Sequence, residues 1–421
     1  MNKPLFSILM PTYNRAHLLP LAIKSVLRQT FEDFELIISN GGSTDNTRDV
    51  IAGFTDSRIR YIETDTKLSM GDNYERALNH ALGEYVIFFS DDDAFILTML
   101  EKVKQAINEQ KFQMLAFPIA YYYHDGGEEH GYRIRKNSLV VPQFSGELKQ
   151  IESDYAIKRQ LNIMGLLELP RDNDYFPPLI GNIACHYSIF EQIKLKTPKF
   201  FPIIPVDTYM ITMILGLMEK FYFLDEPLLV WSNWSQNSSV DIKTGKVALR
   251  QHYEKLLNGE VLQHVPLKFA LPLNCTVNAI LKAKNDLGEP LNSIQMDWIN
   301  YYAKMHEYLI YIQGEGVDTS QEIRELKQVL SEQPVEVQNQ VRAATSHISF
   351  KAKQILKKKL PVVTRVLKSS VQATKNFLGT NIDNKYMLIQ GDSSKFNNVL
   401  ESAEYLTENI LPNLGGRQKI P

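Results

Sequence analysis

Short apolar runs alternate with amphipathic stretches through the first part of the chain. The runs are unbroken, as in strands that are covered on both faces, whereas the stretches between them repeat apolar residues at helical spacing. The predicted strands cover residues 5–10, 34–39, 58–63 and 86–89, and the predicted helices cover residues 17–29, the stretch after 45 and residues 72–82. Strands and helices in alternation predict βαβ units and therefore an α/β sheet.

The pattern changes further along the chain. Residues 113–145 are predicted to form short strands that contain aromatic residues. Two further strands are predicted, a buried one at 181–185 and another at 221–231. From about residue 245 the apolar residues recur at helical spacing. We therefore expect an α/β domain with a mainly helical C-terminal extension. The expected parts are residues 1–240, with halves at 1–120 and 121–240, a helical accessory region at 241–320 and a helical tail at 321–421.

Polar loops follow three of the predicted strands. Residues 11–15 read Pro-Thr-Tyr-Asn-Arg, residues 40–45 read Asn-Gly-Gly-Ser-Thr-Asp, and residues 91–93 are three aspartates. Ligands of α/β sheets bind beyond the strand C-termini, so we expect the loops to form one site. An aromatic ring, a cation, glycines and carboxylates suit a nucleotide diphosphate with a divalent metal ion. Each loop alone is equally compatible with a helix cap or a solvated turn.

Together these loops resemble the successive signatures of family 2 glycosyltransferases with the GT-A fold. The matching segments are residues 7–15, 35–47 and 83–93. The resemblance implies a nucleotide-binding mixed sheet flanked by helices. It also implies an inverting transfer of a sugar from a nucleoside diphosphate sugar, with Mg²⁺ or Mn²⁺ as cofactor, to a glycan or lipid-linked acceptor of a bacterial surface polysaccharide.

The resemblance further implies roles for individual residues. Asp207 would be the general base, Asp92 and Asp93 would bind the metal, and a UDP-sugar is the expected donor. An N-cap at Asp207 and an exposed helix face at residues 72–82 are the structural alternatives. The candidate nucleotide- and donor-binding residues are Pro11, Thr12, Tyr13, Arg15, Asn40, Gly42, Ser43, Asn73, Arg76 and Asp91.

Three features depart from the family pattern. Relatives usually carry Asp where Asn40 stands, an acidic pair where Val206 and Asp207 stand, and a His in the closing loop that corresponds to residues 231–239. These departures leave a catalytically degenerate nucleotide-binding scaffold as an alternative. A nucleotidyltransferase is the alternative enzyme, although the Gly-rich N-terminal loop with arginine and lysine that is usual for that class is missing.

Composition excludes several other classes. The chain has 421 residues, 44% of them hydrophobic, and a formal net charge of −2, which is not the charge of a globally basic nucleic-acid-binding protein. Cys185 and Cys275 are far apart, so neither a disulfide framework nor a zinc site is predicted. No apolar stretch reaches the roughly 20 residues that span a bilayer, and the N-terminus is interpreted as a strand rather than a signal peptide. We expect a cytoplasmic protein.

A basic segment lies near the C-terminus. Between Val337 and Ile382 the only charged side chains are lysines and arginines. Within it, residues 349–378 repeat apolar positions at helical spacing, which predicts two short amphipathic helices. We expect these to bind the anionic inner face of the cell membrane, and not nucleic acid. The alternative is a helical pair packed on the protein with a solvated basic face.

Overall fold

The computed structural model describes most of the chain and divides it into two compact units. The first unit comprises Met1–Ser153, Asn173–Ser235 and Gly379–Pro421, and the second comprises Asp154–Asp172 and Gln236–Leu378. The closing-loop residues 234–239 and the basic segment 349–378 lie outside the described residues. Those described are 3–129, 132–163, 178–203, 205–233, 257, 262–292, 294–314, 317–345, 381–382, 386–389 and 395–414.

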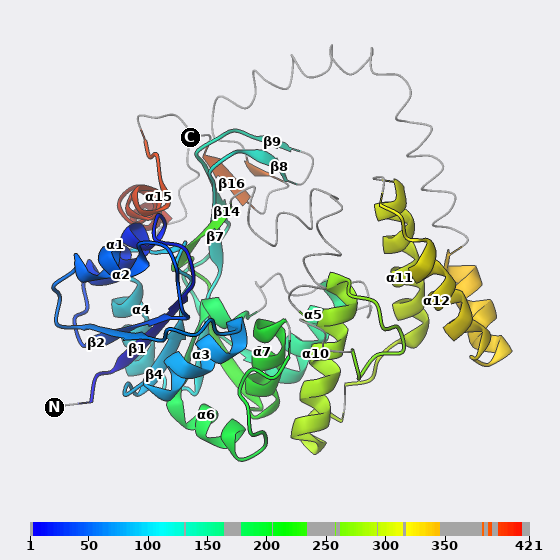
Figure 1. Ribbon diagram of the computed structural model, residues 1–421. Helices are drawn as coiled ribbons and strands as arrows, with labels where there is room; N and C mark the ends of the chain where they lie inside the picture. Colours follow the sequence, from blue (N-terminus) through cyan, green and yellow to red (C-terminus); the bar gives the residue numbers. More distant parts are fainter. Residues whose placement is uncertain are drawn as a thin grey trace, which may run out of the picture. The chain divides into compact units, whose positions relative to one another are not determined.

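The first unit is built on an eight-stranded mixed sheet (Figure 1). Its strand order is β11-β13-β6-β12-β4-β1-β2-β3, and β4, β1, β2 and β3 run parallel to one another. This parallel part is the βαβ series that the sequence predicts. The strands are β1 (Phe6–Thr12), β2 (Phe34–Asn40), β3 (Ile59–Glu63), β4 (Tyr85–Phe88), β6 (Met114–Ala116), β11 (Leu148–Glu152), β12 (Ile183–His186) and β13 (Lys220–Leu224).

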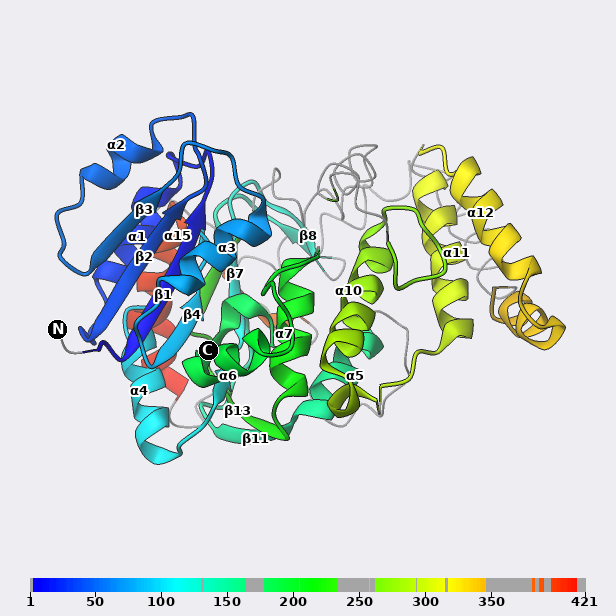
Figure 2. The same ribbon diagram turned by 60° about the horizontal axis from the view of Figure 1, so that its bottom comes forward.

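Helices cover both faces of the parallel strands, which explains why those strands are continuously apolar. Figure 2 shows α3 in front of β1 and β2, with α1 behind them. Phe6, Ile8 and Met10 of β1 pack in one buried cluster with Ile23 and Val26 of α1. The helices of this unit are α1 (Leu19–Leu27), α2 (Thr47–Ala52), α3 (Met70–Asn79), α4 (Met99–Glu109), α6 (Tyr187–Lys194), α7 (Val206–Gly216) and the short η1 (Ile180–Asn182).

A second sheet of six strands completes the first unit, in the order β15-β16-β10-β7-β14-β5. Immediately after the three aspartates the chain enters this sheet, because β5 pairs antiparallel with β14. A separate hairpin joins β8 (Gly127–Glu129) to β9 (Tyr132–Ile134). The sheet strands are β5 (Ala94–Phe95), β7 (Ile119–Tyr123), β10 (Ser138–Pro142), β14 (Leu229–Asn233), β15 (Asn381–Ile382) and β16 (Tyr386–Ile389).

The C-terminal residues differ from the expected helical tail at 321–421. Strand β16 pairs with β10, and α15 (Val399–Tyr405) contacts α1, β5 and β14. Phe396 is 1% exposed and packs against Tyr122 and Tyr405. Burial of these apolar side chains attaches the end of the chain to the first unit. A π-helical turn, η4 (Leu406–Ile410), and a 3₁₀ turn, η5 (Leu411–Leu414), follow α15.

The described residues of the second unit are mainly helical, as the apolar spacing indicates. A buried amide organises its centre: Asn274 Nδ2 donates to the carbonyl oxygens of Leu267 and Phe269, each at 2.9 Å, and Tyr301 donates to Asn274 Oδ1 at 2.7 Å. Of the helices that the structure describes, none is long and apolar enough to cross a membrane. The elements are α5 (Ser153–Ile163), α10 (Pro272–Leu287), η2 (Glu289–Leu291), α11 (Trp298–Gly314) and α12 (Ser320–Ser331).

Candidate active site

The loops after β1 and β4 are joined by two short hydrogen bonds. Pro11 and Thr12 end β1, which lies beside β4, and Thr12 Oγ1 donates to Asp91 Oδ2 at 2.6 Å. Arg15 Nη1 donates to Asp92 Oδ2 at 2.8 Å and lies 3.8 Å from Asp91 Oδ1. A charge-assisted hydrogen bond of this kind is stronger than a neutral one. The guanidinium and two carboxylates therefore form one connected cluster.

The loop after β2 joins the same edge of the sheet. The Asn14 N–H donates to Ser43 Oγ at 2.9 Å, and the Thr44 N–H donates back to Asn14 Oδ1 at 2.7 Å. Gly42 has φ +82°, and a Cβ there would lie 2.7 Å from the carbonyl oxygen of Thr66, so only glycine fits without strain. The three sequence-predicted loops are therefore brought together in space.

The three aspartates are 5–6% exposed, but their carboxylates have different partners. Asp91 and Asp92 face Thr12 and Arg15. Asp93 Oδ1 instead accepts a hydrogen bond from the Ser232 N–H at 2.9 Å, and Ser232 Oγ donates to the carbonyl oxygen of Asp92. The Asp93 carboxylate thus connects the loop to β14, whereas the other two face the β1 loop.

Burial and mutual repulsion disfavour the ionised forms of this cluster. Burial, together with the charge of Asp92, raises the pKa of Asp91 to about 7, although Arg15 and Thr12 act in the opposite direction. Burial also raises the pKa of Asp93 well above its usual value. One guanidinium therefore compensates the carboxylates incompletely, and an additional cation would stabilise their ionised forms.

The donor set fits a divalent cation that arrives with a diphosphate. Within the part of the chain that the structure describes, no group of three or more His, Cys, Asp and Glu side chains forms a complete metal site. Mg²⁺, however, commonly uses one or two carboxylates and takes its remaining oxygens from phosphates and water. Asp91 and Asp92 offer two buried carboxylates for such an ion.

The predicted donor contacts on α3 have different surroundings. Asn73 is 5% exposed, and its amide accepts from Ser39 Oγ at 2.7 Å and donates to the Thr12 carbonyl oxygen at 3.2 Å. It therefore fixes α3 to the ends of β1 and β2. Arg76 donates one Nη2 hydrogen bond to the Glu63 carbonyl oxygen, while its buried Nη1 has no partner among the described residues.

Asn40 belongs to a hydrogen-bonded chain that leads away from the aspartates. Its Oδ1 accepts from the Ser43 N–H and its Nδ2 donates to Tyr61 Oη, both at 2.9 Å. Tyr61 in turn donates to Glu63 at 2.7 Å, and Glu63 pairs with Arg48 at 2.9 Å. This chain fixes the orientation of the Asn40 amide, which is 4% exposed.

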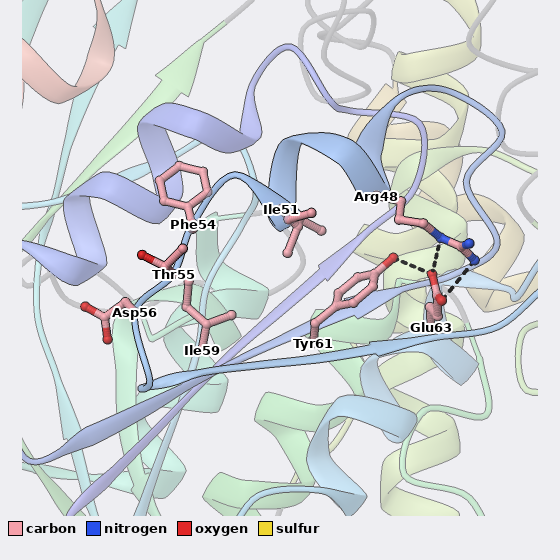
Figure 3. Close-up of a pocket in the computed structure, with 9 residues that line it drawn as sticks. Arg48, Ile51, Phe54, Thr55, Asp56, Ile59, Tyr61 and Glu63 are labelled. Carbon is pink, nitrogen blue, oxygen red and sulfur yellow. Dashed lines mark hydrogen bonds and ion pairs between the residues drawn. The ribbon is translucent and has the colours of Figure 1, made fainter.

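The Tyr61, Glu63 and Arg48 side chains line a hollow of about 430 Å³ between α2 and β3 (Figure 3). Ile51, Phe54 and Ile59 contribute its apolar wall. The sequence reasoning missed this hollow, because its lining alternates along an edge strand and comes from a helix of only six residues.

Asp207 lies in the first turn of α7 and does not cap it. The N-cap is Pro205, and Asp207 Oδ1 accepts from the adjacent Thr208 N–H at 2.8 Å. This geometry removes the structural alternative of an N-cap. Burial raises the pKa of Asp207, while the Thr208 N–H lowers it. Val206, which stands where the family has another acid, is 5% exposed and packs inward.

Tyr74 of α3 packs with its ring against Phe88 of β4 and against Phe201, which precedes α7. Burial raises the pKa of its phenol, and the charges of Asp91, Asp207, Asp92 and Asp93 raise it further. The sequence analysis did not select Tyr74, because a tyrosine on an amphipathic helix resembles any other core residue.

Residues 7–164 match the family model described as Glycosyl transferase family 2. The chain is similar to this family over these residues, and its mixed sheet with flanking helices agrees with the GT-A fold that the resemblance implies. The family expectation from the sequence is confirmed.

Two curated relatives illustrate the match. A Campylobacter jejuni GalNAc(5)-diNAcBac-PP-undecaprenol beta-1,3-glucosyltransferase is 32% identical over 154 residues, which cover 34% of this chain and 50% of the relative. The Escherichia coli UDP-Glc:alpha-D-GlcNAc-diphosphoundecaprenol beta-1,3-glucosyltransferase WfgD is 33% identical over 144 residues, which cover 34% of this chain and 52% of that protein. The chain thus spans about half the length of these relatives.

The chain is also similar to a solved structure of S. aureus TarS, residues 1–349, in complex with UDP-GlcNAc. The identity is 13% and the TM-score is 0.44, and the match covers 83% of this chain and 91% of the TarS chain.

The raised pKa of Asp91 predicts a pH-dependent stability. Between about pH 4, the ordinary pKa of an unfolded aspartate, and about pH 7, the folded state retains a proton that the unfolded state releases. The free energy of unfolding of the metal-free protein therefore falls as the pH rises through this window. Asp91→Asn should flatten the dependence and raise stability at pH 8, since an amide still accepts from Thr12.

Urea unfolding of both proteins at several pH values in the presence of EDTA measures this effect. Asp33→Asn, at an exposed position, is the matched control and should keep the wild-type slope. Equal slopes for the wild type and Asp91→Asn would show that Asp91 does not titrate in this window.

Proposed function

We propose that the chain is an inverting glycosyltransferase that transfers a sugar from a UDP-sugar to a lipid-linked or glycan acceptor of a bacterial surface polysaccharide. The observation that carries the proposal is the joined cluster of Thr12, Arg15, Asp91 and Asp92 at the edge of a family 2 sheet. The names of the two relatives support the acceptor class, since both describe transfer to undecaprenol-linked diphosphates. WfgD also supports the nucleotide, because its name specifies UDP-Glc.

The nucleotide would bind across the three loops. The half-buried ring of Tyr13, with Lys67 Nζ 5.0 Å from its centroid, offers an aromatic face and a cation. The buried Arg76 Nη1 has no hydrogen-bond partner among the described residues and could donate to the nucleotide. The backbone at Gly42 and Ser43 allows close approach, and Arg15 carries the charge that suits a phosphate.

Asp91 and Asp92 would hold Mg²⁺ or Mn²⁺ together with the diphosphate. When bound, such an ion stabilises negative charge on a departing diphosphate. Arg15 already touches both carboxylates and therefore lies where it can contact the same phosphates. The sequence-based prediction named Asp92 and Asp93 as the metal ligands. The proposal replaces Asp93 by Asp91, because the Asp93 carboxylate accepts from the Ser232 N–H and positions the loop.

Asp207 would act as the general base. The acceptor hydroxyl oxygen forms a bond to the anomeric carbon, its proton passes to the Asp207 carboxylate, and the bond to the nucleoside diphosphate breaks with both electrons on the departing oxygen. Attack opposite the leaving group inverts the configuration. The raised pKa of Asp207 makes it a stronger base than an ordinary aspartate.

Asp207→Asn tests the proposed reaction. We expect kcat to fall by roughly 10²- to 10⁴-fold, the usual contribution of a general base, while affinity for the UDP-sugar is retained. The measurement is release of UDP from a panel of UDP-sugars with an undecaprenol-diphosphate-linked acceptor.

Asp49→Asn, in the first turn of α2 and exposed, is the matched control and should retain wild-type kcat. A folded Asp207→Asn variant with wild-type kcat would remove Asp207 from the reaction. Release of pyrophosphate instead of UDP would favour a nucleotidyltransferase, and nucleotide binding without turnover would favour a scaffold.

We further propose that residues 349–378 bind the anionic inner face of the cell membrane, where a lipid-linked acceptor lies. The support is the basic and amphipathic sequence of the segment and the lipid-linked substrates named for the relatives. Each basic residue near an anionic surface contributes about 1 kcal/mol. Because residues 386–389 and 395–414 belong to the first unit, deletion of the C-terminal part would damage the fold, and charge removal is the cleaner test.

Replacement of Lys357, Lys358 and Lys359 by Gln should weaken binding by about 3 kcal/mol in total. Flotation with vesicles of increasing anionic lipid content at low salt measures the loss. Replacement of the exposed Lys194, Lys196 and Lys220 by Gln removes the same charge elsewhere and should leave binding unchanged. Equal flotation of the two variants would locate membrane binding outside this segment.

A further inference from the structure

Tyr74 is held rigidly beside the candidate active site. Its ring packs between Phe88 of β4 and Phe201, with centroid distances of 5.7 and 5.5 Å. Gly71, one helical turn earlier, allows the Phe201 backbone to approach, since a Cβ at that position would lie 2.6 Å from the Phe201 carbonyl oxygen. Lys199 adds an ion pair to Asp72 at 2.9 Å. The hydroxyl group therefore has a fixed position.

The Tyr74 side chain is half-buried, and its hydroxyl makes no hydrogen bond to any residue that the structure describes. Two fully buried tyrosines differ from it in this respect. Tyr85 donates to the Phe112 carbonyl oxygen at 3.1 Å, and Tyr122 donates to Asn137 Oδ1 at 3.0 Å. Tyr74 is thus an unused donor in a rigid setting.

The nearby carboxylates already have partners of their own. Thr12 donates to Asp91, Arg15 donates to Asp92, the Ser232 N–H donates to Asp93, and the Thr208 N–H donates to Asp207. Burial, together with the charges of these carboxylates, raises the pKa of the phenol, so the hydroxyl keeps its proton. Among these anionic acceptors, Tyr74 is a neutral group that can donate to an oxygen atom of a bound molecule.

The reaction geometry indicates which oxygen this is. This step rests on the proposed function, in which the leaving diphosphate lies at Asp91 and Asp92 and the acceptor hydroxyl at Asp207. The transferred sugar must then lie between those two groups. The Tyr74 ring contacts Phe88, which precedes Asp91 by three residues, and Phe201, which precedes Asp207 by six. We propose that Tyr74 donates a hydrogen bond to an oxygen of the transferred sugar and thereby helps to select the sugar of the donor.

The closest test is Tyr74→Phe, which keeps the ring between Phe88 and Phe201 and removes only the hydroxyl. We expect kcat/KM for the preferred UDP-sugar to fall about tenfold, the usual effect of losing one neutral hydrogen bond. Affinity for UDP alone should be unchanged, because UDP lacks the sugar. Thermal unfolding should also be unchanged, because the hydroxyl has no partner among the described residues.

A series of deoxy UDP-sugars, each lacking one sugar hydroxyl, identifies the contact. With the analogue that lacks the contacted oxygen, the wild type and Tyr74→Phe should have equal kcat/KM, since neither can form the bond. Tyr85→Phe is the matched control: it removes the hydrogen bond to Phe112, so stability should fall while sugar preference stays unchanged.

Two results would overturn the role of Tyr74 but leave the proposed function intact. The first is a Tyr74→Phe variant whose kcat/KM for the preferred donor equals that of the wild type. The second is a Tyr74→Phe variant that loses the same factor in kcat/KM with every deoxy analogue. If the wild-type protein turns over no UDP-sugar, the proposed function fails and this inference fails with it. The wild-type assay therefore separates the two failures.

Discussion

Three carboxylates lie buried in succession at the end of β4, and burial of an ionised carboxylate costs several kcal/mol unless charge or hydrogen bonds compensate it. The compensation comes from two parts of the chain. Thr12 and Arg15 bring the β1 loop to Asp91 and Asp92, and the Ser232 N–H brings β14 to Asp93. The same bonds that stabilise the charges therefore fix the position of the loop relative to both sheets.

The support for this loop extends to the end of the chain. Residues 94–95 follow the aspartates directly and form β5, which pairs with β14 and contacts α15. The Leu97 N–H donates to Thr407 Oγ1 at 3.1 Å, and Arg28 of α1 pairs with Glu404. The C-terminal residues thus stabilise the surroundings of the aspartates, although more than 300 positions separate them in sequence.

The sequence was sufficient for those features that depend on local pattern. Strands β1, β2 and β4 are unbroken apolar runs, and the polar loops that follow them converge because parallel strands end at one edge. Features that depend on distant partners were not predictable. Asp93 is positioned by a hydrogen bond from the Ser232 N–H, and β16 is added to the second sheet by pairing with β10. The orientation of the Asn40 amide depends on its hydrogen bond to Tyr61.

Tyr74 shows the same limit at the site itself. Its position on α3 was within a predicted helix, but its relation to Asp207 depends on where α7 lies. The periodicity of apolar residues predicts on which face of a helix a side chain lies, but it does not predict which residue of another element that side chain meets. Asn40 and Val206, which differ from the residues usual in the family, both fit their surroundings. The oxygen and the nitrogen of the Asn40 amide are each hydrogen-bonded, and the Val206 side chain is buried.

Cooperation between nucleotide and metal at Asp91 and Asp92 is the central requirement of the proposed function. Isothermal titration calorimetry of UDP binding to the wild-type protein, with Mn²⁺ and with EDTA, tests this cooperation. We predict that UDP binds substantially more tightly with Mn²⁺ and that Asp92→Asn removes the difference while the protein stays folded. Equal UDP affinity with Mn²⁺ and with EDTA in the wild-type protein would contradict the account.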